Sequence, residues 1–115
     1  MTIGRRPVIR SRAMRRVVPA VILVLLAVAC TDRPDESATG AEIFGQICAA
    51  CHAPDLSGGI GPPLGPGSHA AAQTDEYLLA TISLGRGSRM PSFSRTLTDE
   101  QIRAVVDYIR EVQAG

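Results

Sequence analysis

The chain has 115 residues and a formal net charge of +1. This total joins two unlike segments: residues 1–29 carry six Arg and no acidic residue, a charge of +6, whereas residues 30–115 carry six Arg and eleven acidic residues, a charge of −5. The basic block precedes an apolar run instead of lying on a folded domain, which argues against a nucleic-acid-binding protein. With two Phe, two Tyr and no Trp, the one domain that this length favours has a thin core, and such small domains often need a covalent staple, a metal or a cofactor.

Residues 1–29 are predicted to be a secretory signal peptide. The basic stretch ends at Arg16, and the thirteen apolar residues Val17–Ala29 follow it. A helix of that length rises about 20 Å, which is less than a hydrocarbon core of about 30 Å. A basic stretch followed by a short apolar run is instead typical of secretory signals. The alternative is an uncleaved segment that anchors the chain to a membrane.

Cys30 follows the small residues Ala27, Val28 and Ala29. This arrangement resembles the lipobox of bacterial lipoproteins, although Ala27 stands where Leu is usual. The resemblance implies cleavage before Cys30, acylation of Cys30 and attachment to the membrane, with residues 30–39 as the lipidated Cys and a polar tether. Ordinary cleavage nearby, which would leave a soluble periplasmic protein, is the alternative. A folded domain is expected over residues 40–115.

The first helix of this domain is predicted to begin at Thr39. Thr39 and Glu42 have the spacing of a capping box. The residues that then fall on one helical face are Ile43, Phe44, Ile47, Cys48 and Cys51. Residues 58–67 hold five Gly and three Pro, so we expect a loop without regular structure there.

Two further helices are predicted after this loop. Thr74 is a candidate cap for a helix that ends at Gly85 and directs Leu78, Leu79 and Ile82 inward. Thr98 and Gln101 form a second capping-box pattern, and the flanking apolar pair is Leu97 and Ile102. The apolar stripe that follows consists of Ile102, Val105, Val106, Ile109 and Val112. No segment alternates convincingly as a strand does, so the predicted fold is all-α.

The segment Cys48-Ala49-Ala50-Cys51-His52 carries the candidate chemistry. Two Cys three apart on a helix project to one side, so their thiols are placed to add to the two vinyl groups of haem while His52 reaches the iron. A thioredoxin-like site would need a βαβ context that is missing here. A structural zinc site would need four ligands, and only His69 is available as the fourth. The pattern therefore favours covalent haem c.

Several motifs in order resemble those of the class I cytochromes c, from Gly40 to about Val112. They are Gly40–Phe44 leading into Cys48–His52, then Gly61-Pro62-Pro63-Leu64, Met90-Pro91-Ser92-Phe93, Leu97–Ile102 and Val105–Ile109. The resemblance implies a small cytochrome c fold with three main helices around one covalent haem c. It also implies that Gly40, Phe44 and Tyr108 lie where the first and last helices cross.

The same resemblance implies roles for five residues. Cys48 and Cys51 would form the thioether bonds, and His52 would be the proximal iron ligand. The carbonyl of Pro62 would accept a hydrogen bond from the other imidazole nitrogen, and Met90 would be the distal iron ligand.

Met90 is also indicated independently of the resemblance. It is the only methionine left once a signal peptide with Met1 and Met14 is removed. It lies among Gly and Pro residues that leave its loop free to turn the side chain inward. The competing distal ligand is His69, which we expect to be a solvated loop residue.

An iron with both axial positions filled favours one-electron transfer over catalysis. We therefore expect a monomeric, membrane-tethered electron carrier outside the cytoplasm, which exchanges electrons with redox proteins and is not itself an enzyme. The alternatives are an electron-entry subunit of a larger membrane oxidoreductase, or a haem sensor or enzyme with a labile distal ligand.

The chain has no Lys, and Arg86, Arg89 and Arg95 are the candidates for a local positive patch beside Met90.

Overall fold

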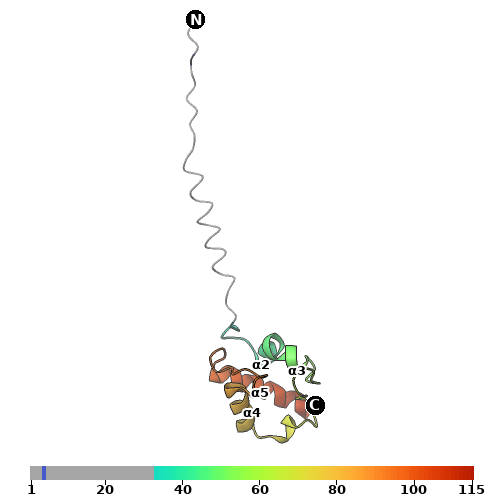
Figure 1. Ribbon diagram of the computed structural model, residues 1–115. Helices are drawn as coiled ribbons and strands as arrows, with labels where there is room; N and C mark the ends of the chain where they lie inside the picture. Colours follow the sequence, from blue (N-terminus) through green and yellow to red (C-terminus); the bar gives the residue numbers. More distant parts are fainter. Residues whose placement is uncertain (1–3, 5–32) are drawn as a thin grey trace. The chain divides into compact units, whose positions relative to one another are not determined.

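The computed structural model describes residue 4 and residues 33–115 (Figure 1). The predictions of a signal peptide over residues 1–29 and of acylation at Cys30 lie outside the described residues. In the part of the chain that is described, no helix is long and apolar enough to cross a membrane.

The described domain is helical, as predicted. Its elements are α2 (Gly40–Ile43), the π-helical turn η1 (Phe44–Cys48), α3 (Ala49–His52), the 3₁₀ turn η2 (Ala70–Ala72), α4 (Asp75–Leu84) and α5 (Asp99–Ala114). Over residues 33–115 the only extended pairing is an isolated antiparallel bridge between Arg86 and Met90. In Figure 1, α5 crosses the domain and contacts both α2 and α4.

The first helical segment begins as predicted but changes its winding. The Thr39 hydroxyl accepts a hydrogen bond from the Glu42 amide at 3.2 Å, and the Glu42 carboxylate accepts one from the Thr39 amide at 2.8 Å. Residues 44–48 are wound as a π-helix, whereas the apolar pattern predicts a continuous α-helix. In a π-helical turn each backbone hydrogen bond joins residues five positions apart, whereas in an α-helix it joins residues four positions apart. The side chains that follow the turn are therefore rotated around the helix axis. Phe44, at the start of this turn, is fully buried, and Cys48, at its end, is partly buried at the wall of a cavity.

The helix crossing predicted for Gly40 is present. A Cβ at position 40 would lie 2.6 Å from the carbonyl carbon of Ala104 on α5, so only Gly permits this approach. The Phe44 and Tyr108 rings meet beside it with their centroids 5.5 Å apart. This contact joins the two ends of the domain sequence.

The caps and buried faces of α4 and α5 agree with the predictions. Thr74 caps α4, and Thr98 forms the capping box with Gln101 at the start of α5. The core consists of Ile43, Phe44, Leu56, Leu78, Ile82, Leu97, Ile102, Val105, Val106 and Ile109. The sequence did not indicate that Leu56 would be buried, because it lies outside the predicted helices. In the structure it is buried and has a left-handed backbone conformation with φ +62°.

The segment before α2 is in contact with the domain. Its composition predicts a tether without packing, but Arg33 donates a hydrogen bond to the Arg95 carbonyl at 2.9 Å, and the buried Gln101 side chain donates one to the Asp35 carbonyl at 3.1 Å. Ala38 also packs against the core. Residues 33–39 are therefore in contact with the domain predicted for residues 40–115.

Candidate functional site

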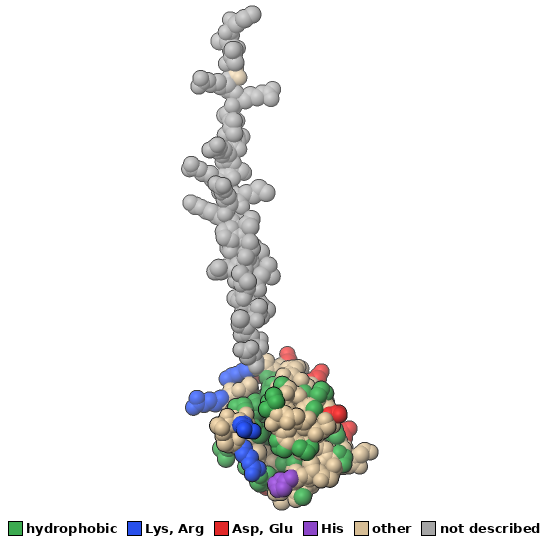
Figure 2. All heavy atoms as spheres, turned by 45° about the vertical axis from the view of Figure 1, so that its right-hand side comes forward, with side chains coloured by type: hydrophobic (Ala, Val, Ile, Leu, Met, Phe, Trp, Pro, Cys, Tyr) green, Lys and Arg blue, Asp and Glu red, His purple; other side chains and the backbone are tan. Residues whose placement is uncertain are grey.

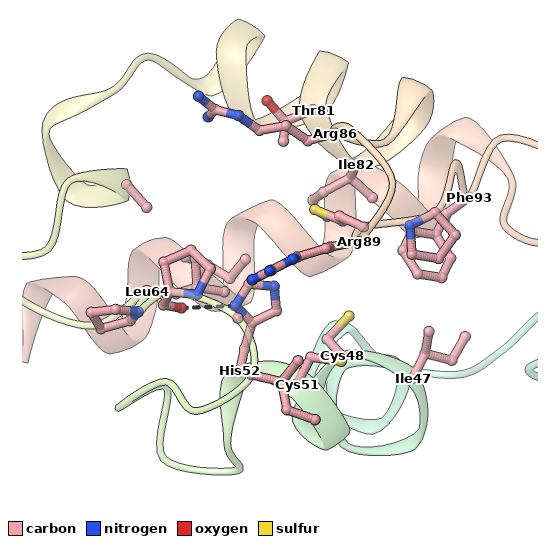
Figure 3. Close-up of a pocket in the computed structure, with 18 of the residues that line it drawn as sticks. Ile47, Cys48, Cys51, His52, Leu64, Thr81, Ile82, Arg86, Arg89 and Phe93 are labelled. Carbon is pink, nitrogen blue, oxygen red and sulfur yellow. Dashed lines mark hydrogen bonds between the residues drawn. The ribbon is translucent and has the colours of Figure 1, made fainter.

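The candidate site is an open cavity of about 390 Å³ inside the described domain (Figure 3). Much of its wall is apolar, with Ile47, Leu64, Ile82, Phe93 and Ile109 among the lining residues. The four residues proposed for haem attachment and iron ligation, Cys48, Cys51, His52 and Met90, line this same cavity although they come from two distant parts of the chain. Figure 3 shows Cys48, Cys51 and His52 on one side and Ile82 and Thr81 on the other.

Cys48 is the last residue of η1 and the N-cap of α3, Cys51 lies within α3, and neither forms a disulfide. Burial raises the pKa of the Cys48 thiol to about 11, and the neighbouring Cys51 adds to the shift. Cys48 is therefore a weaker acid than an exposed cysteine. Within residues 33–115, no group of three or more His, Cys, Asp or Glu side chains is arranged to hold a metal ion.

His52 is buried and held in one orientation. Its Nδ1 lies 2.8 Å from the carbonyl oxygen of Pro62. Because a carbonyl only accepts, Nδ1 carries a proton, and in the neutral ring the lone pair is on Nε2. This is the hydrogen bond that the resemblance implies for Pro62, and it leaves Nε2 as the atom able to bind a metal.

Gly61 makes this orientation possible. A Cβ at position 61 would lie 2.8 Å from Cε1 and 2.9 Å from Nδ1 of the His52 ring. The Gly61 amide donates to the Cys51 carbonyl at 2.8 Å, which fixes the turn against α3. The sequence motif included Gly61, but nothing in it indicated contact with the ring.

The Met90 loop is fastened to the end of α4. The Arg86 amide donates to the Met90 carbonyl at 2.9 Å, and the Phe93 amide donates to the Ile82 carbonyl at 3.1 Å. Ser92 adds a side-chain hydrogen bond to the Ser83 carbonyl. Met90 is therefore held at the cavity wall by backbone contacts on both sides.

Gly85 allows this loop to lie close to α4. It has a φ of +75°, and a Cβ there would lie 2.6 Å from the Met90 carbonyl oxygen. Its role as the helix stop is confirmed, whereas its close approach to the Met90 backbone could not be read from the sequence.

His69 is exposed, as expected, but it also lines the cavity. Its Nε2 lies 3.1 Å from the side-chain nitrogen of Gln73. An amide nitrogen only donates, so this contact makes Nε2 an acceptor and occupies its lone pair. The arrangement favours Met90 over His69 as the second ligand.

Two arginines contribute to the polar part of the cavity wall. Arg86 and Arg89 both line it, and Arg86 donates a hydrogen bond to the hydroxyl of Tyr77. Arg95, the third residue of the predicted positive patch beside Met90, is not among the residues that line the cavity. On the face drawn in Figure 2, Arg side chains gather on one flank and acidic side chains on the other.

The residues present fit a covalently bound haem. The cavity combines a mostly apolar wall, two thiols that form no disulfide, one imidazole whose Nε2 is not hydrogen-bonded to Pro62, and one thioether. Because Gly61 has no side chain, the His52 ring can occupy its observed orientation in the cavity. Tyr77 and Thr81 also line the cavity, and the sequence pattern did not single them out.

Comparisons with known proteins agree with this reading. Residues 35–109 match the family described as cytochrome c oxidase, cbb3-type, subunit III. The chain is 31% identical to cytochrome c55X of Stutzerimonas stutzeri over 112 residues, which cover 96% of each chain. It is also 33% identical over 90 residues to the cbb3-type cytochrome c oxidase subunit CcoP of Rhodobacter capsulatus, covering 70% of this chain. The chain spans only 30% of that longer subunit.

A solved structure gives the same result in three dimensions. The c-type cytochrome NirC is 33% identical and superposes with a TM-score of 0.57, covering 68% of this chain and 94% of NirC. The similarity therefore covers nearly the whole of a small c-type cytochrome.

Proposed function

The chain belongs to the class I cytochrome c family and binds haem c covalently, and we propose that Cys48 and Cys51 form its two thioether bonds. We further propose His52 Nε2 and the Met90 sulfur as the axial iron ligands. The observation that carries this assignment is the convergence of these four side chains on one mostly apolar cavity. The hydrogen bond from His52 Nδ1 to the Pro62 carbonyl supports it, because such bonds orient a ligating imidazole and increase its basicity.

The function of the chain is one-electron transfer. When bound, haem c supplies a redox centre that gains or loses one electron, and His/Met ligation raises its reduction potential. The loop contacts that hold Met90 favour a permanently filled second axial position. Such a site leaves no room for oxygen or a substrate, so we propose a carrier between redox proteins and not an enzyme or a gas sensor.

A spectroscopic experiment tests the assignment. A pyridine haemochrome assay of the purified full-length protein should give the spectrum of haem with two thioether bonds. The oxidised protein should show the weak near-red band of sulfur-ligated iron, and the reduced protein should bind carbon monoxide slowly. A protein that lacks covalent haem would overturn the attachment sites, and rapid carbon monoxide binding would instead favour the sensor or enzyme.

We propose that the domain acts outside the cytoplasm, tethered to the membrane by an acylated Cys30. The support is the sequence alone: a basic stretch, a short apolar run and small residues before the Cys. Tethering would raise the effective concentration of the carrier near membrane-bound partners. A Cys30→Ala variant should move from the membrane to the soluble fraction. If both proteins fractionate identically, the lipid anchor is wrong.

A second candidate is an electron-entry subunit of a larger membrane oxidoreductase. The similarity to the CcoP subunit favours it. Mild solubilisation followed by size-exclusion chromatography separates the two proposals. A free carrier should elute as a monomer, whereas a subunit should co-elute with integral membrane proteins.

A further inference from the structure

A polar network lies on the α5 side of the candidate site, outside the motifs that identify it. It is centred on Arg110 and Gln113, which are both partly buried near the end of α5. The Arg110 guanidinium donates to Asp75 at 2.7 Å and to the Gln73 carbonyl at 2.5 Å. It also donates to the side-chain oxygen of Gln113 at 2.7 Å. One arginine thus connects α5 with the beginning of α4.

Gln113 extends this network to the loop beside His52. Its side-chain nitrogen donates to the carbonyl of Leu64 at 2.8 Å. Arg110 offers only donors and a carbonyl offers only an acceptor, so the Gln113 amide has one possible orientation. A side chain that both accepts and donates is needed here. Glu would keep the first contact and lose the second, and Leu would lose both.

Leu64 lies two residues after Pro62, whose carbonyl accepts the hydrogen bond from His52. This turn is held on its α3 side by the Gly61 amide and the Cys51 carbonyl, and at Leu64 by the Leu64 amide and the Leu56 carbonyl. Both contacts are made within residues 51–64. The Gln113 contact is the side-chain hydrogen bond that joins this turn to α5.

We propose that Arg110 and Gln113 are positioning residues for His52. By holding the Leu64 carbonyl they hold the preceding Pro62 carbonyl at Nδ1 of the imidazole, and thereby set the basicity of the ligand and the reduction potential. This inference rests on the proposed role of His52 as an iron ligand. A looser Nδ1 hydrogen bond makes the imidazole a weaker donor, which stabilises oxidised iron less and raises the potential.

The test uses Gln113→Leu and Gln113→Glu in the full-length holoprotein. Ala114→Leu and Ala114→Glu are the matched controls. They introduce the same two side chains at Ala114, the exposed neighbour of Gln113 on the same helix. Relative to its control, each Gln113 variant should shift the equilibrium with a reference redox couple toward the reduced protein by at least threefold, about 28 mV for one electron. The His52 Nδ1 proton, followed by NMR in the reduced state, should exchange with solvent at least threefold faster.

The outcomes separate this inference from the assignment of the site. One result would overturn the inference: both Gln113 variants retain covalent haem, have the same reduction potential as their controls, and exchange the His52 Nδ1 proton as slowly as the unaltered protein. The network would then only stabilise the fold, even if the melting temperature of the variants falls. If the unaltered protein lacks covalent haem or His52 ligation, the proposed site itself fails.

Discussion

Gly61 lies against the ring of His52 so closely that a Cβ would approach Cε1 to 2.8 Å and Nδ1 to 2.9 Å. The same turn carries the Pro62 carbonyl that accepts the Nδ1 hydrogen bond. A residue with a side chain at position 61 would have to move either the ring or the turn. The missing side chain therefore helps to set the orientation of the imidazole in the cavity.

A Gly61→Ala substitution should destabilise the holoprotein by about 1–3 kcal/mol, the usual cost of overfilling a packed site. It should also lengthen the contact between His52 and Pro62 and raise the reduction potential. Thermal unfolding and potentiometric titration measure the two effects. Gly59→Ala is the control, because a Cβ there would meet nothing closer than the Cys51 carbonyl oxygen at 3.5 Å. Equal stability and equal potential in the two variants would contradict the packing argument.

Replacing Met90 with Ala should remove the near-red band of the oxidised protein and lower the reduction potential, because the thioether favours reduced iron. The open position should bind carbon monoxide rapidly after reduction. The matched variant is His69→Ala, since His69 lines the same cavity and was the competing ligand. It should keep the band and bind carbon monoxide slowly. The reverse pattern would assign His69 as the ligand.

Gly85→Ala tests whether close packing against α4 holds the Met90 loop in place. A Cβ at position 85 would lie 2.6 Å from the Met90 carbonyl oxygen and 2.7 Å from the Pro91 carbonyl carbon. We expect a weakened near-red band and faster carbon monoxide binding, both followed optically. Gly87→Ala is the control, because Gly87 also has a positive φ of +59° but open space around it. If both substitutions weaken the band equally, backbone strain and not the contact is responsible.

Features that depend on neighbours in sequence could be predicted. A capping box needs only two residues three positions apart, so the pairs at Thr39 and Thr98 were evident. The motif Cys48–His52 likewise places its three functional side chains within one short segment. The π-helical turn over residues 44–48 could not be predicted, because an apolar pattern at helical spacing is compatible with both windings.

Features that depend on distant residues could not be predicted. Gln113 and Leu64 are separated by 49 positions, and neither has a neighbour that indicates the other. The contact of Gly61 with the His52 ring depends on how a Gly/Pro loop folds back on α3, and its composition only excluded regular structure. Leu56 is buried for the same reason, since the loop folds over it.

The capping box at Thr39 should contribute to stability in a pH-dependent way. Hydrogen bonds from the Thr39 amide and hydroxyl lower the pKa of Glu42. Their contribution is therefore fully present above the ordinary Glu pKa of about 4.3 and is lost as pH falls through the lower pKa of the folded state. Thr39→Ala should cost about 1 kcal/mol at pH 7.

Urea unfolding of the holoprotein between pH 7 and pH 3 measures this effect. The Glu42→Gln variant should lose part of the acid-dependent fall in stability. Glu36→Gln is the control, because Glu36 is exposed and lies in the same part of the chain. An unchanged pH profile in Glu42→Gln would show that the hydrogen bonds seen at this cap are not made in solution.

The haem-free chain should be largely unfolded. The cavity of about 390 Å³ lies where α3, α4, α5 and the loops meet, so without its occupant the apolar walls are left exposed to water. A group bound only by the folded state contributes its binding free energy to folding, and a domain of this size has little stability in reserve. Far-UV circular dichroism of a Cys48→Ala, Cys51→Ala double variant should therefore show weak helical signal without a cooperative melt. Native-like helix with a sharp thermal transition would mean that the side chains alone stabilise the fold.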